Sequence, residues 1–183
     1  MLQIGDRMKK ESIKTHFRRY RIYSKRSTTI NHAFASAVAP SDKYSADRID
    51  EILCQLDCVR EGKIVCVYCG VREAQTWDHL YPLVKASRPT GHGHTYGNLV
   101  PSCKDCNSTK GNRDWSDANL VINAQNPDQA IRVHRLISLH LAAHKTSGNC
   151  LISHELMSVL EDMKAQIIQI MRNADELIDK HLA

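Results

Sequence analysis

The spacing of apolar residues predicts helices towards both ends of the chain and short strands in its middle. We expect helices over residues 31–38, from Ser45 to about Leu56, and from Pro127 to about Lys145. After Ser45 the apolar positions recur every three or four residues, as they do along one face of a helix. Serine before a helix and proline in its first turn are both favoured there. The pattern therefore places helical segments on both sides of a central region.

The longest predicted helix covers residues 152–182 and carries a heptad seam. Its apolar residues recur at alternating spacings of four and three, namely Leu156, Leu160, Met163, Ile167, Ile170, Ala174 and Leu177. A seam of this kind packs on another helix. The pattern leaves open whether that helix belongs to the same domain, to a second copy of the chain or to another protein.

The central region changes to short β-type segments. Residues 63–70, 75–79 and 98–101 are short runs that favour strands. Residues 86–97 contain Ser, Pro, Thr, three glycines and two histidines, which predicts a long loop. Residues 102–112 predict a helix that ends near a glycine. The expected fold class is therefore α+β, mostly α, with a small central core.

These elements divide the chain into three expected segments. Residues 1–61 would form a basic N-terminal arm and helices, residues 62–116 the core, and residues 117–183 the C-terminal helices. Length and composition agree with a globular protein, because 42% of the 183 residues are hydrophobic and 25% are charged.

The net charge of +5 is unevenly distributed along the chain. Residues 1–26 hold nine Lys or Arg against Asp6 and Glu11, whereas residues 151–183 hold six acids against three bases. The basic arm could contact a polyanion such as nucleic acid or be a solvated surface. No apolar run is long enough for a membrane span and no signal peptide is evident, so we expect no membrane partner and a cytoplasmic location.

The seven cysteines favour a metal site over a disulfide framework. Their number is odd, and four of them form two pairs, Cys66-Val-Tyr-Cys69 and Cys103-Lys-Asp-Cys106. Four thiolates in two CxxC pairs suit the tetrahedral geometry of a structural zinc ion. The long separation of the two pairs indicates that another functional segment is inserted between them.

The inserted segment carries residue types suited to phosphodiester hydrolysis. Asp78 and His79 are adjacent, and Asn98 and Asn107 follow. Carboxylate and amide oxygens bind hard divalent ions, and a neutral histidine can accept a proton from water. Adjacent side chains in a strand point to opposite faces, so Asp78 could hold an ion while His79 faces a water, provided that the end of the strand is bent.

Three motifs in this order resemble the zinc-stapled form of the HNH endonuclease family. They are Asp78-His79-Leu-Tyr-Pro82, Gly97-Asn98-Leu-Val-Pro101 and Cys103-Lys-Asp-Cys106-Asn107-Ser-Thr-Lys110-Gly111. The resemblance covers about residues 64–115 and implies two antiparallel strands and a helix around one catalytic ion. It also implies an endonuclease that acts on nucleic acid, with DNA expected, and a role in restriction or phage defence.

The resemblance assigns a role to each residue of the site. His79 matches the general base and Asn98 the middle asparagine that steadies the loop and helps to orient the base. Asp78 and Asn107 match the ligands of the catalytic ion. The commonest form of the motif has histidine at position 107. Asparagine there favours Mg²⁺ or Mn²⁺ over catalytic zinc.

Residues around the motif allow further expectations and alternatives. Lys104, Lys110 and Arg113 could bind nucleic-acid phosphates or belong to a solvated helix face. Trp77 and Trp115 are expected in the core. His92 and His94 could contact substrate or be residues of a flexible loop, and we expect the flexible loop. Two alternative functions are a zinc-stapled nucleic-acid-binding module without catalysis and a nuclease effector subunit gated by a partner.

Overall fold

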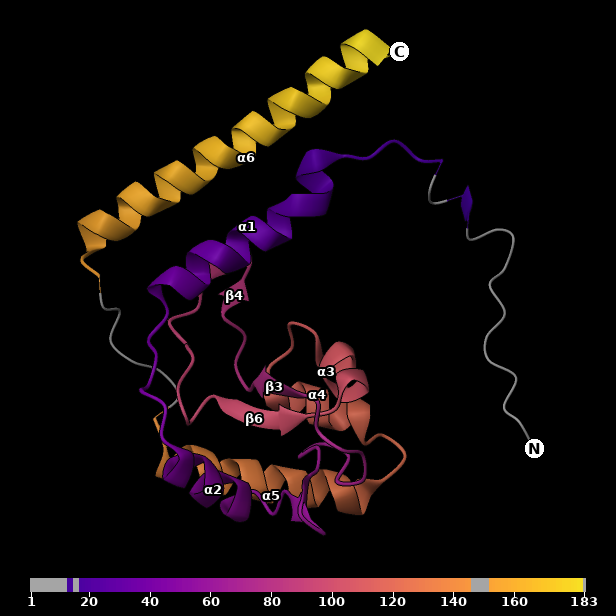
Figure 1. Cartoon of the computed structure of the whole chain (residues 1–183), viewed down its shortest axis with the longest axis vertical. Helices are drawn as coiled ribbons and strands as arrows, with labels where there is room; N and C mark the ends of the chain where they lie inside the picture. The colour runs from indigo at the N-terminus through magenta and orange to yellow at the C-terminus, as the bar shows by residue number, and fades with distance from the viewer. Residues whose placement is uncertain (1–12, 15–16, 146–151, 183) are drawn as a thin grey trace.

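The computed structural model describes residues 13–14, 17–145 and 152–182 (Figure 1). The helices are α1 (Ile22–Val38), α2 (Ala46–Gln55), α3 (Lys104–Lys110), α4 (Trp115–Ile122), α5 (Pro127–Ala143) and α6 (His154–Leu182). The strands are β1 (Val59–Arg60), β2 (Lys63–Ile64), β3 (Thr76–His79), β4 (Val84–Lys85), β5 (Arg88–Pro89) and β6 (Leu99–Ser102). The expected fold class, α+β and mostly α, is confirmed.

A two-stranded antiparallel sheet and the helix that follows it form the centre of the molecule. Strand β3 pairs with β6, which places Asp78 opposite Val100 and His79 opposite Leu99. Helix α3 begins directly after β6, with Cys103 as its N-cap, and ends at Gly111, whose φ of +54° suits glycine. This hairpin and helix have the order that the motifs predicted.

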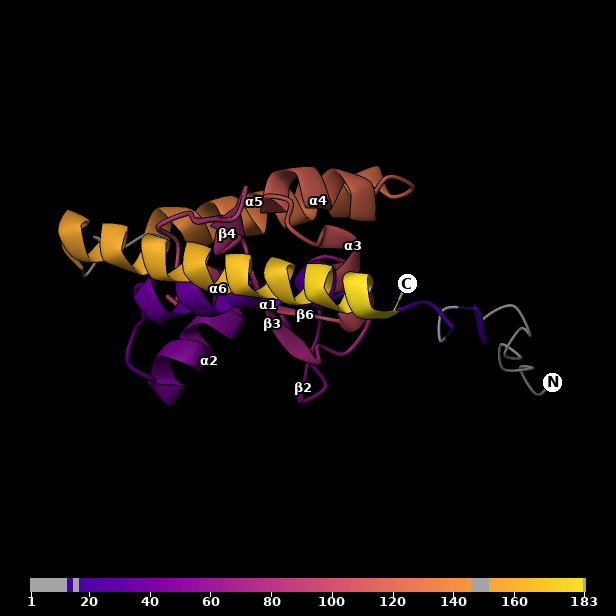
Figure 2. The same ribbon diagram turned by 90° about the horizontal axis from the view of Figure 1, so that it is seen from above.

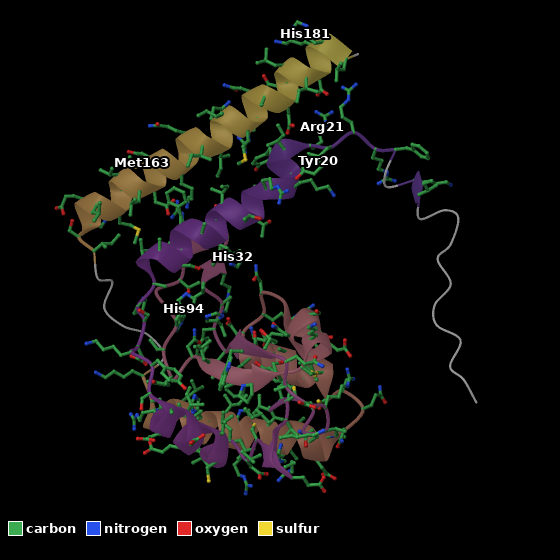
Figure 3. The ribbon with its side chains drawn as sticks, in the orientation of Figure 1. Tyr20, Arg21, His32, His94, Met163 and His181 are labelled. Carbon is green, nitrogen blue, oxygen red and sulfur yellow. The ribbon has the colours of Figure 1, made fainter. Side chains whose placement is uncertain are left out.

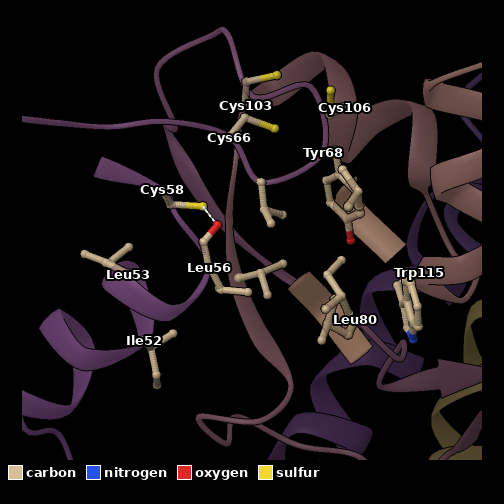
Figure 4. Close-up of a cluster of buried hydrophobic side chains, with 14 residues drawn as sticks. Ile52, Leu53, Leu56, Cys58, Cys66, Tyr68, Leu80, Cys103, Cys106 and Trp115 are labelled. Carbon is tan, nitrogen blue, oxygen red and sulfur yellow. Dashed lines mark hydrogen bonds between the residues drawn. The ribbon is translucent and has the colours of Figure 1, made fainter. Parts of the chain in front are cut away.

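One hydrophobic core joins this centre to the flanking helices. Ile52 from α2, Val100 from β6 and Val133 from α5 are all buried in it, together with Leu80 and Tyr68 (Figure 4). Helices α2 and α5 cover the side of the β3–β6 sheet that is opposite to α1 (Figure 1). Side chains from all three expected segments therefore share one core.

Helices α1 and α6 form a pair that extends beyond the core, with α1 between α6 and the rest of the protein (Figures 1 and 2). Both oxygens of the buried Asp175 carboxylate accept bonds from the backbone N–H groups of Ile22 and Tyr23, at 2.8 and 3.0 Å. Arg19 and Arg21 form ion pairs with Asp179. Part of the basic arm therefore contacts the acidic C-terminal helix. The expected arm also includes residues 1–12 and 15–16, which lie outside the described residues.

The long C-terminal helix is confirmed, but its heptad seam is not the face that contacts α1. Lys164 and Asp175 are the buried residues of α6, whereas the seam residues Met163, Ile170 and Leu177 are 52%, 67% and 58% exposed. The contact with α1 therefore relies on polar anchors beside a few half-buried apolar side chains. Docking of a second copy or a partner on the seam stays a prediction.

Three local expectations were wrong. Helix α1 begins at Ile22 rather than near residue 31, and α4 was not predicted. The expected loop over residues 86–97 contains β5, which pairs with β4 through a turn at Ala86 and Ser87. Both turn residues have positive φ, at 49° and 64°, without the glycine or asparagine that usually marks such a turn. Across the described residues, no helix is long and apolar enough to cross a membrane.

Candidate active site and metal centre

The four cysteines of the two CxxC pairs come together at one point. Their sulfur atoms all lie within 4.8 Å of one another, and only Cys69 is not fully buried. Cys66 and Cys69 lie in a tight turn in which the Gly70 N–H donates to the Cys66 carbonyl at 2.8 Å. Cys103 and Cys106 begin α3 (Figure 4). Tetrahedral zinc with bonds of about 2.3 Å needs sulfurs roughly 3.8 Å apart, so the cluster fits a structural zinc ion.

The electrostatics of the cluster also fit a bound cation. A hydrogen bond from the Cys106 thiol lowers the pKa of Cys66 to about 4, while that bond and burial raise the pKa of Cys106. One thiolate is therefore favoured at the expense of its neighbours, because several negative charges cannot share this space unaided. A divalent cation removes that conflict.

Strand β3 presents the two central motif residues to opposite sides. Asp78 is 5% exposed and faces α3, whereas His79 and Trp77 lie on the other face. This alternation agrees with the prediction that the Asp78 and His79 side chains point to opposite faces of the strand. Trp77 is 39% exposed, so the expectation that it belongs to the core was wrong, while Trp115 is buried as expected.

The carboxylate of Asp78 is held by two buried partners. The Tyr68 hydroxyl donates to Oδ2 at 2.8 Å, and the Lys110 ammonium lies 3.4 Å from Oδ1. Burial raises the pKa of Asp78, and the Lys110 charge and the Tyr68 hydrogen bond oppose that rise. The Lys110 charge therefore compensates this buried carboxylate and favours its ionised form. A divalent ion bound by Asp78 would have to displace the Lys110 ammonium or share the carboxylate with it.

Lys110 is buried, which contradicts the expectation that it contacts phosphates or lies on a solvated helix face. Its side chain is 1% exposed and points to Asp78, so it is neither a solvated residue nor a group that can reach a phosphate outside the core. Lys104 is exposed in the first turn of α3. Arg113 is also exposed, and its guanidinium donates to the carbonyls of Thr109 and Lys110 at 2.6 and 3.3 Å at the end of the helix.

Asn107, the second expected ligand of the catalytic ion, lies on α3 one turn before Lys110. Its side chain is half-buried. The spacing of three residues puts the Asn107 and Lys110 side chains on neighbouring parts of one helix face. Lys110 reaches Asp78 from that face. The carboxylate of β3 and the amide of α3 thus belong to the same side of the hairpin.

His79 is half-buried and contacts a second histidine. Its Nε2 atom lies 3.1 Å from Nδ1 of His94, with the two ring planes at 67°. Burial, His94, Lys110 and His32 lower the pKa of His79 to about 4. Figure 3 shows His94 in the loop and His32 on α1. His79 is therefore neutral near pH 7 and has a nitrogen lone pair that can accept a proton.

Asn98 is fully buried and ties the loop to the end of β3. Its Oδ1 accepts from the Tyr81 N–H at 2.8 Å, and its Nδ2 donates to the carbonyls of Tyr81 and Gly93 at 3.1 and 3.0 Å. Because Gly93 precedes His94, these bonds fix the backbone beside the partner of His79. Asn98 therefore positions the loop and has no exposed surface for substrate.

The connection between α1 and α2 holds His94 from the other side. The His94 N–H donates to the Pro40 carbonyl at 2.8 Å, and the His94 carbonyl accepts from the Asp42 N–H at 3.1 Å. A Cβ atom at Gly93 would lie 1.9 Å from the Pro40 oxygen, so only glycine fits there. The expectation of a flexible His94 was wrong.

The sequence analysis also missed Tyr68, because its place inside a CxxC pair gives no signal of its contact with Asp78.

Comparison with known proteins gives one match, and it falls on this region. The model of the HNH endonuclease family matches residues 66–113, from the first cysteine of the cluster to Arg113. Neither the search of curated proteins nor the search of solved structures found a match. The matched range contains the four cysteines, Asp78, His79, Asn98 and Asn107, all of which the fold gathers around β3, β6 and α3. Residues 66–113 of this chain are therefore similar to the HNH endonuclease family.

Proposed function

We propose that this chain is a metal-dependent endonuclease that hydrolyses phosphodiester bonds of nucleic acid, with DNA as the expected substrate. The observation that carries the proposal is the division of roles along β3, with a buried carboxylate on one face and a neutral histidine on the other. Hydrolysis needs a group that takes a proton from water and a cation near the phosphate. The two faces of β3 supply one requirement each.

Asp78 and Asn107 would hold the catalytic ion through oxygen atoms, which favours Mg²⁺ or Mn²⁺. When bound, such an ion neutralises charge on the phosphate oxygens. The protein supplies the dry surroundings of Asp78, in which the Tyr68 hydroxyl keeps the carboxylate oriented. A zinc ion bound by the four cysteines would hold α3, and so Asn107, at a fixed distance from β3.

His79 would act as the general base, with His94 as its positioning residue. If His79 carries its proton on Nε2, that N–H donates to the Nδ1 lone pair of His94, and His79 Nδ1 is free to accept a proton from water. The opposite direction of the bond would occupy the Nε2 lone pair and place the proton on Nδ1. Only the first arrangement leaves a base. Asn98 holds the loop that carries His94.

A nucleic-acid-binding module without catalysis explains the zinc cluster but not the rest of the site. Such a module needs neither a buried Asp78 nor a histidine pair held from two sides. The other alternative, a nuclease gated by a partner, is a refinement of the proposal, and the exposed apolar row of α6 offers a surface for it. Family resemblance extends the proposal to restriction or phage defence.

Cleavage of supercoiled plasmid tests the proposal. The wild-type protein should nick or cut the plasmid with Mg²⁺ or Mn²⁺ and not without a divalent ion. The His79→Ala variant should lose about 10²–10⁴-fold in rate, which is the typical contribution of a general base. Its zinc content and melting temperature should match the wild type. A variant that cleaves at the wild-type rate would remove His79 as the base.

A further inference from the structure

A pocket of about 390 Å³ opens beside the proposed base. Three aromatic side chains, Trp77, Tyr44 and Tyr96, contribute to its wall, and Ile52 and Leu99 are among its apolar lining. The volume lies within the range of small-ligand sites. Aromatic walls around an apolar floor suit a flat, aromatic ligand.

The register of the sheet places this pocket next to His79. Leu99, which lines the pocket, is the cross-strand partner of His79, and opposite residues in an antiparallel pair have neighbouring side chains. Trp77 precedes His79 by two residues and shares its face of β3. His94, bonded to His79 at 3.1 Å, also lines the pocket. A ligand in the pocket would therefore lie within one or two side chains of the base.

The exposure of the aromatic walls points to stacking. Tyr44 is 83% exposed and Trp77 39% exposed, although only 5% of the chain is aromatic. Tyr96 is fixed in place, because its hydroxyl donates to the Lys43 carbonyl at 2.7 Å and its N–H to Asp42 at 2.8 Å. Two accessible rings and one fixed ring give a stacking platform.

A second, more polar cavity of about 510 Å³ continues from the first. Asp42 and Tyr96 line both, and the basic residues Lys43, Arg48 and Lys145 line the second alone. Basic side chains contact the phosphates of a nucleic-acid strand, while aromatic side chains contact its bases. The two cavities are therefore complementary to a nucleotide, because the aromatic cavity suits its base and the basic cavity suits its phosphate backbone.

We propose that the aromatic pocket binds one unpaired nucleobase of the strand that is cleaved by the water that His79 deprotonates, with the backbone of that strand running over the basic cavity. The proposal rests on the proposed nuclease function and narrows its substrate to strands with an accessible base, either single-stranded or with one base turned out of the duplex. The Asp42 carboxylate at the junction could accept a hydrogen bond from an amino group of the base.

Binding of two oligomers of equal charge tests this inference. One is an oligothymidylate and the other has the same backbone with abasic residues, and affinities are measured without divalent ions so that neither is cut. The wild type should bind the oligothymidylate about tenfold more tightly than the abasic oligomer, as expected for loss of a stacked base. Trp77→Leu and Tyr44→Leu should each remove most of that difference and leave binding of the abasic oligomer unchanged.

Tyr20→Leu is the matched control, because Tyr20 is also an exposed tyrosine, at 52%, but lies before α1 and outside the pocket. It should keep the tenfold preference. The base-binding proposal would be overturned if the wild type bound both oligomers equally, or if Trp77→Leu and Tyr44→Leu kept the preference. Either result would count against the proposal even if the wild type cleaves plasmid. A preference that the pocket variants remove would support the base site even if plasmid cleavage fails.

Discussion

The two faces of β3 are built by different means. The Asp78 face is closed by the core and by α3, which begins at the cysteine cluster and carries Lys110 to Asp78 beside Tyr68. The His79 face depends on a loop that hydrogen bonds hold to Asn98 and to the connection before α2. One side therefore relies on packing and on the cysteine cluster, for which we propose a zinc ion, whereas the other relies on single hydrogen bonds. A substitution on the Asp78 face should therefore destabilise the whole core, whereas a substitution on the His79 face should have a local effect.

Loss of the zinc cluster should have the largest effect. Cys103→Ser removes one of the four sulfur ligands and keeps a residue that suits the N-cap of α3. Zinc binding, worth on the order of 10 kcal/mol in small zinc peptides, should therefore be lost together with the fold of the core. Zinc content and thermal melting measure this. Cys54→Ser is the control, because Cys54 is exposed and should change neither value. Full zinc content with an unchanged melting curve in Cys103→Ser would refute the structural site.

Removal of the buried positive charge beside Asp78 should come next. Lys110→Met leaves a desolvated carboxylate without its partner, which should lower the free energy of unfolding by about 3 kcal/mol. Added Mg²⁺ should recover part of the loss if the ion binds this carboxylate. Lys104→Met, on the exposed surface of the same helix, should have little effect in the same denaturant titration. Equal stability of the two variants would contradict the pairing.

The stability of the protein should depend on pH through His140, which contacts the loop of His94 at Tyr96. His140 is buried in α5 and its Nε2 lies 3.0 Å from the Tyr96 carbonyl, while burial lowers its pKa to about 4. The unfolded chain binds a proton below about pH 6.5 and the folded chain does not. Stability is therefore full above pH 6.5 and should fall by roughly 3 kcal/mol towards pH 4.

His140→Gln separates this contribution from that of His79, whose pKa is also lowered to about 4. Glutamine keeps a donor for the Tyr96 carbonyl but does not titrate, so the slope of unfolding free energy against pH should become shallower between pH 4 and 6.5. An unchanged slope would show that His140 does not contribute in this way.

Loss of the His94 contact should be the smallest and most local effect. His94→Ala should lower kcat about tenfold, which corresponds to the loss of one hydrogen bond, and should leave zinc content and stability near wild type. His94→Asn retains an acceptor close to the position of Nδ1 and should recover most of the rate. Nitrogen NMR should show the proton of His79 on Nε2 in the wild type and a mixture of tautomers in His94→Ala. Equal rates for all three proteins would exclude the positioning role.

The sequence predicted the parts of the site that depend on local spacing. The CxxC pairs, the β3–β6 hairpin and α3 lie within one short segment, and their chemistry needs fixed residue types at fixed distances along the chain. Contacts between distant segments were missed. Nothing near Lys110 indicates that it turns inward to Asp78, and the role of His94 depends on Pro40 and Asp42 from another part of the chain.

The sequence-based predictions for elements outside the site were wrong for similar physical reasons. Helix α6 has an apolar seam that predicts packing, yet its contact with α1 is anchored by Asp175 and Asp179, which meet backbone N–H groups and arginines that periodicity does not reveal. The β4–β5 hairpin turns at Ala86 and Ser87, two residue types that seldom adopt positive φ. In both places tertiary contacts outweigh local preference.

The division of roles along β3 is tested most directly by Mn²⁺ binding and cleavage measured on the same two variants. Electron paramagnetic resonance of Mn²⁺ reports occupancy, and plasmid nicking reports chemistry. Asp78→Asn should lose both bound Mn²⁺ and cleavage, whereas His79→Ala should bind Mn²⁺ as the wild type does and lose only cleavage. If His79→Ala also failed to bind Mn²⁺, or if Asp78→Asn retained it, the assignment of ligand and base to opposite faces of the strand would be contradicted.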